Sequence, residues 1–381
     1  MADHDQYMHR ALELAQRATG CVTPNPLVGA VVVQNGAIVG EGWHQSAGTA
    51  HAEVHALENA GGKSAGSTLY VTLEPCSHFG RTPPCTEAII KAGVSTVVYA
   101  VDDPNPQAAG GGAALEAHGL RVVRHVLKRE ALHTNRFFFH FQKEKTPYVV
   151  AKFAASLDGK TATRNGHSQW ITGPEARHRG HQLRQAVDAI VVGADTAIQD
   201  NPSLTVRLSE EALAGRAVCH PIRIVLDSSG RVPLHNNLFD TELPGTTVVA
   251  TTDAMSVEHE QSLNTNGVDV WRITPAKRTS SGKSRVCLHG LCQKLGSTGI
   301  QSLMVEGGQT LLGEFRDAGL IQEIWAFLAP VIIGGEQAPG CFGSLGSDQL
   351  EDALTLSTLS AESIGNDVLI RATIESHRRT A

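Results

Sequence analysis

Four residues in the first part of the chain have the types and the order needed to bind a catalytic metal ion. His51 is followed two positions later by Glu53, and Cys76 and Cys85 each follow a proline. One imidazole and two thiolates suit Zn²⁺ and leave a fourth tetrahedral position open for water. Such a metal lowers the pKa of its water to ~7, and Glu53 is free to carry a proton from that water to a leaving amine. The pattern therefore predicts a hydrolytic zinc site.

Two other zinc sites use part of the same pattern. A structural site needs a fourth ligand, which His55 or His78 could supply. The pair His51 and His55 has the spacing of a zinc protease helix, but that motif requires Glu where this chain has Ala52. Only the hydrolytic site assigns a function to each of His51, Glu53, Cys76 and Cys85.

The segments around these residues predict an α/β layer. Asn35-Gly36 between two apolar runs is typical of a hairpin turn, because both turn residues must tolerate positive φ. Further strands are expected at residues 68–73, 95–101 and 120–126, and helices at 51–60, 85–91 and 113–118. Because strands and helices alternate, a partly parallel sheet is expected.

A polar segment at residues 142–147 separates this layer from a second series of strands. We therefore expect two domains, 1–146 and 147–381. Strands are expected in the second domain at residues 148–155, 189–192, 222–227, 246–251, 268–273, 302–305 and 323–329. This domain has no Gly-x-Gly-x-x-Gly after a strand, but Gly307-Gly308 lies between a strand and a helix, where a backbone could approach a cofactor phosphate. Taken alone, such a glycine pair is more often a simple turn.

Composition narrows the class of partner. The 381 residues carry a formal net charge of -6, whereas proteins that hold a nucleic-acid backbone usually have a positive surplus. The apolar run at residues 27–33 is too short to span a bilayer, and the acidic N-terminus lacks the apolar core of a signal peptide. We expect a cytoplasmic enzyme with a small-molecule substrate, and neither nucleic acid nor membrane as partner.

The metal-site residues resemble the cytidine-deaminase superfamily, whose signature is His-x-Glu followed by Pro-Cys-x-x-Cys. This chain differs from it because eight residues, not two, separate Cys76 from Cys85. That insert is similar to the one in bifunctional riboflavin-biosynthesis deaminase–reductases. The segments 24–29, 103–106, 155–159, 168–172, 200–207 and 305–308 are similar to the same family.

The resemblance implies a cytidine-deaminase-like three-layer domain followed by a dihydrofolate-reductase-like α/β domain. The first would deaminate 2,5-diamino-6-(5-phosphoribosylamino)pyrimidin-4-one, and the second would reduce the ribosyl group of the product to ribityl with NADPH. It also implies that Zn²⁺ is bound by His51, Cys76 and Cys85, and that Glu53 is the proton carrier. The residues implied to hold the first substrate are Asn25, His44, His78, Asp103 and Asn105.

For the second domain, the resemblance implies a cofactor site and a substrate site. The cofactor residues would be Ala154, Trp170, Thr196, Asp200, Ser228 and a stretch beginning with Gly308, Gln309 and Thr310. The substrate residues would be Lys152, Ser168, Arg184, Leu204, Arg207 and Glu306. Arg184 and Arg207 would suit a phosphate, because a guanidinium offers paired donors. Lys152, Glu306 or water would handle the proton, and the family tends to form homo-oligomers through this domain.

Two rival functions stay open on the residues alone. The first is a nucleoside or nucleic-acid base deaminase of the same zinc class, which must accept an unpaired base. The second concerns the C-terminal half, which could be a non-catalytic nucleotide-binding module. Ammonia release from nucleic acid and NADPH oxidation with the deaminated intermediate distinguish these functions from the bifunctional enzyme.

Overall fold

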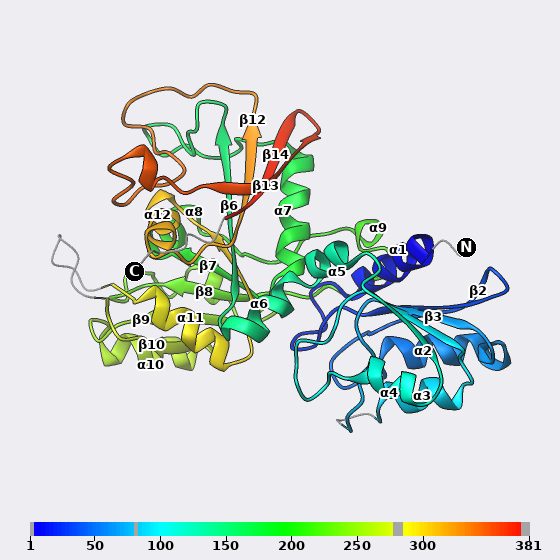
Figure 1. Cartoon of the computed structure of the whole chain (residues 1–381). Coiled ribbons are helices and arrows are strands. Elements are labelled where there is room, and N and C mark those ends of the chain that lie inside the picture. Colours follow the sequence, from blue (N-terminus) through cyan, green and yellow to red (C-terminus); the bar gives the residue numbers. More distant parts are fainter. Residues whose placement is uncertain (1–3, 80–82, 277–284, 375–381) are drawn as a thin grey trace. The chain divides into compact units, whose positions relative to one another are not determined.

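The computed structural model describes residues 4–79, 83–276 and 285–374, and the chain divides into two compact units (Figure 1). The first unit ends at Lys145 and also contains Gly215–Ala217, whereas the second begins at Thr146. Within the described ranges, every helix is too short or too polar to cross a membrane.

The first unit is built on a five-stranded sheet in the order β2-β1-β3-β4-β5. The strands are β1 (Gly29–Gln34), β2 (Ala37–Trp43), β3 (Thr68–Val71), β4 (Thr96–Tyr99) and β5 (Arg121–Arg124). β1 is antiparallel to β2 and β3, while β3, β4 and β5 are parallel to one another. The expected hairpin is confirmed, and both Asn35 and Gly36 have positive φ.

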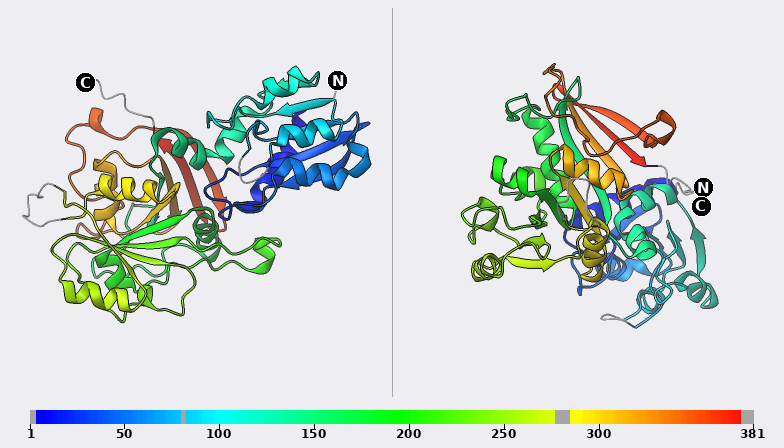
Figure 2. Two further views of the ribbon diagram at one scale, coloured as in Figure 1. Left: turned by 90° about the horizontal axis from the view of Figure 1, so that it is seen from below. Right: turned by 90° about the vertical axis from the view of Figure 1, so that its left-hand side faces the viewer.

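Helices cover both faces of this sheet, as Figures 1 and 2 show. The helices are α1 (His4–Ala15), α2 (Ala52–Ala60), α3 (Cys85–Lys91), α4 (Gly111–Ala117), α5 (Lys128–Thr134) and α6 (Arg136–Glu144). Val32 and Leu69 join a core with α2, α3 and α4, whereas the neighbouring Val31 and Tyr70 join a core with α1. Because successive side chains of a strand point to opposite faces, one sheet supplies both cores and the unit has three layers.

Two glycines allow close contacts next to the predicted metal site. A Cβ on Gly42 of β2 would lie 2.4 Å from the carbonyl oxygen of Ala52, in the first turn of α2. A Cβ on Gly111, where α4 begins, would lie 1.7 Å from the carbonyl oxygen of Pro75. Any larger residue would therefore push α2 away from β2, or α4 away from the segment that carries Cys76.

The second unit has a nine-stranded sheet in the order β10-β9-β8-β7-β11-β6-β12-β14-β13. Its strands are β6 (Tyr148–Ser156), β7 (Ala189–Gly193), β8 (Ile222–Leu226), β9 (Thr247–Thr251), β10 (Asp269–Arg272), β11 (Ser302–Glu306), β12 (Glu323–Ala329), β13 (Leu356–Ile364) and β14 (Asp367–Ile374). The strands from β10 to β12 are parallel to their neighbours, and β14 and β13 extend the sheet in antiparallel fashion.

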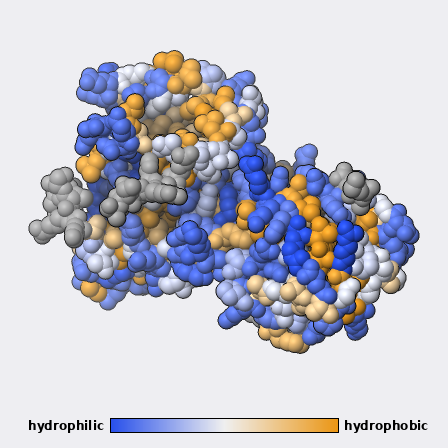
Figure 3. Space-filling model, viewed as in Figure 1, coloured by the Kyte–Doolittle hydropathy of each residue, from blue (hydrophilic) through white to orange (hydrophobic). Residues whose placement is uncertain are grey.

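Both faces of the parallel part of this sheet are buried. The helices of the unit are α7 (Pro174–Ala186), α8 (Ala194–Asp200), α9 (Glu210–Leu213), α10 (Val257–Thr265), α11 (Leu288–Ser297) and α12 (Gln309–Asp317). Val149 and Val305 pack with α11 and α12 in one large core, and the alternate side chains Val150 and Met304 are fully buried as well. The face of the molecule in Figure 3 is mainly hydrophilic, since the strands place their apolar side chains inside.

The strands and helices expected from the sequence are present, mostly with shifted ends. β3 stops at Val71 instead of residue 73, and α4 begins at Gly111 instead of residue 113. The hairpin of β13 and β14 was not predicted. β13 is an edge strand whose residues are nearly all exposed, so it lacks the alternation of apolar and polar residues that predicts a half-buried strand.

Candidate active sites

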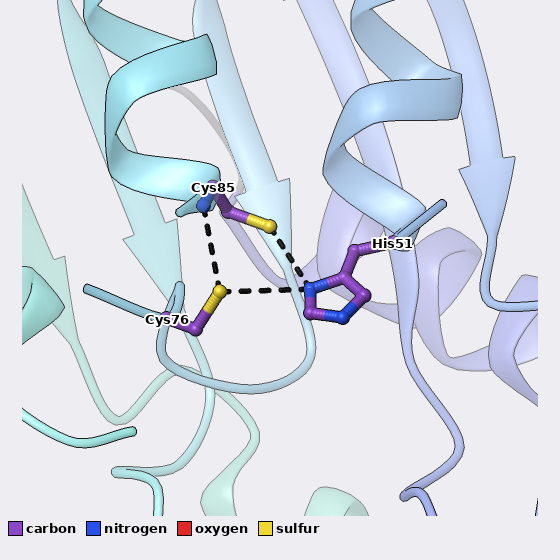
Figure 4. A group of neighbouring side chains, drawn as sticks. All are labelled: His51, Cys76 and Cys85. Carbon is purple, nitrogen blue, oxygen red and sulfur yellow. Dashed lines mark hydrogen bonds between the residues drawn. The ribbon is translucent and has the colours of Figure 1, made fainter. Parts of the chain in front are cut away.

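His51, Cys76 and Cys85 converge from three separate segments (Figure 4). His51 directly precedes α2, Cys76 follows β3, and Cys85 is the first residue of α3. The Nδ1 atom of His51 lies 3.1 Å from Sγ of Cys85 and 3.6 Å from Sγ of Cys76. A tetrahedral Zn²⁺ with normal bond lengths would hold a nitrogen and a sulfur ligand about 3.6 Å apart. These residues therefore fit zinc.

The composition of this cluster favours a catalytic zinc over a structural one. In the part of the chain that the structure describes, His51, Cys76 and Cys85 form the whole group of potential ligand atoms. His55 and His78, which could have supplied a fourth ligand, are not part of it. A site with three protein ligands keeps one position for water or substrate.

The surroundings of Cys76 favour its thiolate form. Its thiol pKa is lowered to about 4, mainly by the hydrogen bond with the Cys85 thiol and further by the one with His51. The backbone N–H of Cys85 also donates to Sγ of Cys76 over 3.4 Å. Because only a thiolate is a good metal ligand, these contacts prepare the site for a cation.

Glu53 lies in the first turn of α2 and is 3% exposed. Its burial raises the pKa of the carboxyl group. A carboxyl group with a raised pKa exchanges a proton more readily near neutral pH than an exposed one. Glu53 lines a cavity of about 440 Å³ together with His51 and Cys76.

The same cavity brings together every residue that the resemblance implies for the first substrate. These are Asn25, His44, His78, Asp103 and Asn105. Nδ1 of His44 donates to the carbonyl oxygen of Ala50 over 3.2 Å, and its Nε2 accepts from the amide of Asn25 over 2.9 Å. Burial lowers the pKa of His44, so this ring is neutral.

The insert between Cys76 and Cys85 reaches the cavity through His78. Nδ1 of His78 is buried and has no hydrogen-bond partner within the described residues. A buried polar atom of this kind is expected to meet a ligand or water. Residues 80–82 of the insert lie outside the described residues.

Glu74 is a residue of this site that sequence reasoning missed. It is 7% exposed, and its two carboxylate oxygens accept the backbone N–H groups of Gly112 over 2.9 Å and Asp103 over 3.2 Å. Glu74 thus ties the Cys76 segment to the loop that carries Asp103 and Asn105. Its one sequence signal was a charged residue directly after an apolar strand and before Pro75-Cys76.

The second unit carries a largely buried charged cluster made of Lys152, Arg184 and Glu306, whose side chains are 17%, 9% and 23% exposed. Nζ of Lys152 donates to Oε1 of Glu306 over 2.7 Å, and Nη2 of Arg184 donates to Oε2 over 2.8 Å. Lys152 and Glu306 are register partners on the adjacent strands β6 and β11, and Arg184 comes from α7. Burial alone would raise the pKa of Glu306, but Lys152 and Arg184 hold it well below its usual range.

Arg184 is less available for a phosphate than the sequence suggested. Its Nη1 donates to the carbonyl oxygen of Thr205 over 2.7 Å, so both terminal nitrogens have protein partners. Arg207, by contrast, has an exposed side chain. Leu204, in the same segment, is buried and has a φ of 50°.

Several residues implied for the cofactor lie near the carboxyl ends of parallel strands. Ala154 is near the end of β6, Thr196 follows β7, and Ser228 follows β8. Oγ1 of Thr196 accepts the backbone N–H of Gly308 over 3.2 Å, which joins the Gly307-Gly308 turn to α8. This end of an open parallel sheet is where ligands of α/β proteins bind.

The other implied residues are spread more widely. Asp200 ends α8, and burial raises its pKa. Gln309 begins α12 and accepts the N–H of Gly340, and Thr310 follows it. Ser168 and Trp170 lie in the connection between β6 and α7, where Trp170 is 67% exposed and the guanidinium of Arg177 stacks on its ring at 4.6 Å.

Comparison with known proteins covers both units. The family model described as the RibD C-terminal domain matches residues 147–370, and the model of the cytidine and deoxycytidylate deaminase zinc-binding region matches residues 1–101. The riboflavin biosynthesis protein RibD of Actinobacillus pleuropneumoniae is 42% identical over 373 residues, which cover 97% of this chain and 95% of that protein. The RibD of Escherichia coli (strain K12) is 42% identical over 374 residues, or 96% of this chain and 98% of that protein.

Solved structures give the same result. The structure of Acinetobacter baumannii RibD matches with a TM-score of 0.84 and 36% identity, covering 98% of this chain and 100% of that chain. A diaminohydroxyphosphoribosylaminopyrimidine deaminase/5-amino-6-(5-phosphoribosylamino)uracil reductase from Thermotoga maritima matches with a TM-score of 0.83 and 34% identity, covering 98% of this chain and 99% of that one.

Proposed function

Because this chain belongs to the RibD family and is a zinc-dependent deaminase and an NADPH-dependent reductase of riboflavin biosynthesis, we propose how its residues divide the two reactions. The deaminase residues lie in the unit that ends at Lys145, and the reductase residues lie in the unit that begins at Thr146. We assign the two activities to residues 1–146 and 147–381.

In the deaminase, His51, Cys76 and Cys85 hold Zn²⁺, which when bound lowers the pKa of a water molecule. Glu53 would accept a proton from that water and pass it to the amino group, so that the water oxygen replaces on the ring the nitrogen that leaves as ammonia. We assign His44, Asn25, Asp103 and Asn105 to the binding of 2,5-diamino-6-(5-phosphoribosylamino)pyrimidin-4-one, because they line the cavity that contains Glu53. His78 lines the same cavity, and its Nδ1 has no hydrogen-bond partner within the described residues, which supports a role in substrate binding.

The observation that carries this proposal is the buried carboxyl group of Glu53 in one cavity with the ligand cluster. The test is zinc removal by a chelator, followed by assays of both activities. Ammonia release from the diaminopyrimidine phosphate should disappear and return with added Zn²⁺. NADPH oxidation with the deaminated substrate should persist throughout, and a parallel loss of both activities would contradict the assignment to separate units.

In the reductase, NADPH supplies the hydride that reduces the ribosyl C1. Lys152 is the residue we assign to the accompanying proton, because its ammonium group is held by Glu306 over 2.7 Å and its side chain is 17% exposed. Arg184 shares Glu306 and thereby orients the carboxylate, while Arg207 is the residue we assign to the substrate phosphate. Ala154, Thr196, Ser228 and the Gly308 turn would hold the cofactor, because they lie near the carboxyl ends of parallel strands. Substitution of Lys152 by Met should abolish NADPH oxidation and leave ammonia release unchanged.

We further propose that copies of the chain associate through the second unit and that the enzyme works in the cytoplasm, where NADPH is available. The exposed edge strand β13, with Leu359 62% exposed, supports such an association. Light scattering of the purified chain tests the oligomeric state.

A further inference from the structure

The segment of residues 204–207 has an irregular backbone that side chains hold in place. It lies between α8 and α9 and contains neither helix nor strand. Leu204 has a φ of 50°, a conformation that L residues other than Gly, Asn and Asp rarely adopt. Leu204, Thr205 and Val206 are all buried, so the backbone N–H and C=O groups here need partners inside the protein.

Three consecutive residues of this segment are bound by side chains of the second unit. Nη1 of Arg184 donates to the carbonyl oxygen of Thr205 over 2.7 Å. The N–H of Val206 donates to Nδ1 of His220 over 3.2 Å, and the N–H of Arg207 donates to Nδ1 of His181 over 3.2 Å. His181 and Arg184 are one helical turn apart on α7, and His220 lies just before β8.

Both histidines accept hydrogen bonds, which only a neutral imidazole does. The pKa of His181 is lowered to about 4, mainly by burial and then by the positive charges of Arg184 and Arg207. Glu306 raises this pKa by a smaller amount, and Lys152 lowers it slightly further. Burial and the charge of Arg223 lower the pKa of His220. Both rings are therefore acceptors at neutral pH.

We propose that His181 and His220 are positioning residues for the reductase substrate, which they serve by fixing the backbone of residues 204–207. This inference rests on the reductase function proposed above, because Leu204 and Arg207 are substrate residues only in that reaction. Lys152, Arg184 and Glu306 lie on regular elements, whereas residues 204–207 are held by these two imidazoles together with the guanidinium of Arg184. Neither histidine needs to touch the substrate.

The experiment compares three substitutions of His181 in the full-length zinc enzyme. His181→Asn places an amide oxygen close to the position of Nδ1, His181→Gln places one near the position of Nε2, and His181→Ala removes the acceptor. His220→Asn and His220→Ala form a second pair. His289→Ala, at an exposed histidine of α11, is the matched control.

Initial rates of NADPH oxidation are measured against the concentration of the deaminated substrate and, separately, of NADPH. Removal of the acceptor should raise the KM for the substrate about tenfold, because one backbone N–H of the segment loses the partner that fixes its position. The KM for NADPH should stay unchanged, and both Asn variants should restore most of the substrate affinity. Ammonia release reports in every sample that the first unit is folded, and the unchanged KM for NADPH reports the same for the second unit.

Equal substrate KM values for His181→Asn, His181→Gln and His181→Ala would overturn the inference, as would a KM for His181→Ala equal to that of His289→Ala. If His181→Ala fails to fold, the comparison of the Asn and Gln variants decides. Failure of the unmodified enzyme to oxidise NADPH with the deaminated substrate would instead refute the proposed reductase function.

Discussion

Replacing Glu306 by Gln removes the negative charge that two buried cations share. Glu306 accepts from Lys152 over 2.7 Å and from Arg184 over 2.8 Å, and the side chains of these cations are 17% and 9% exposed. Removal of one partner from a buried ion pair costs about 3–5 kcal/mol, because the remaining charge stays buried without compensation. Gln has the same shape and keeps one acceptor oxygen, so we expect a cost at or just below the lower end of this range, about 2–3 kcal/mol.

The loss should be visible in thermal unfolding of the second unit. At ~2–4 °C per kcal/mol for a domain of this size, the expected decrease in Tm is about 5–10 °C. The matched control is Glu362→Gln, since Glu362 lies 3.5 Å from Arg179 with both side chains 35–43% exposed. An exposed ion pair contributes at most ~1 kcal/mol, so the control should lose less than about 4 °C.

The two activities make this test more specific. Glu306→Gln should lower the rate of NADPH oxidation by ~10²-fold or more, because Lys152 loses the carboxylate that holds it, while ammonia release stays at the level of the unmodified enzyme. A Tm change equal to that of Glu362→Gln, together with an intact reductase rate, would refute the charge-cluster reasoning.

The remaining predictions concern pH and the deaminase unit. The pKa of Glu306 is lowered in the folded state. The stability that the Glu306 carboxylate contributes is therefore fully present above the pKa of an unfolded Glu, ~4.3, and is lost as the pH falls below that value. The Tm difference between the unmodified chain and Glu306→Gln should shrink below about pH 4. Glu53→Gln should keep its zinc in metal analysis but lose ammonia release by ~10²–10⁴-fold, and a normal rate would rule out the proton transfer. Cys85→Ser should lose the metal itself, so a stoichiometric zinc content would contradict its role as ligand. Glu74→Gln should raise the deaminase KM about tenfold, because the Gln side chain has one acceptor oxygen for the two backbone N–H groups that Glu74 binds. The control Glu116→Gln, on the surface of α4, should leave this KM unchanged.

The sequence by itself determined the metal chemistry and the order of the strands from β1 to β12. The combination of one His, one Glu and two Cys in this order (His51, Glu53, Cys76 and Cys85) indicates few functions other than a catalytic zinc site. Zinc binding requires only these residue types and a fold that brings them together. The hairpin turn at Asn35-Gly36 and the buried parallel strands of the second unit were equally readable, because local backbone preference and apolar runs decide them.

The tertiary structure alone decided how charged and polar groups divide among partners. Arg184 was predicted to meet phosphate, yet it lies between Glu306 and the Thr205 carbonyl oxygen, since α7 is packed where its guanidinium meets both. The roles of Glu74 and His181 were not predicted from the sequence, because each binds backbone N–H groups of residues 26 to 38 positions away. Backbone N–H and C=O groups are the same in almost every residue type, so the sequence of a segment does not indicate which distant side chain binds its backbone. Only the folded chain reveals which donor each acceptor meets.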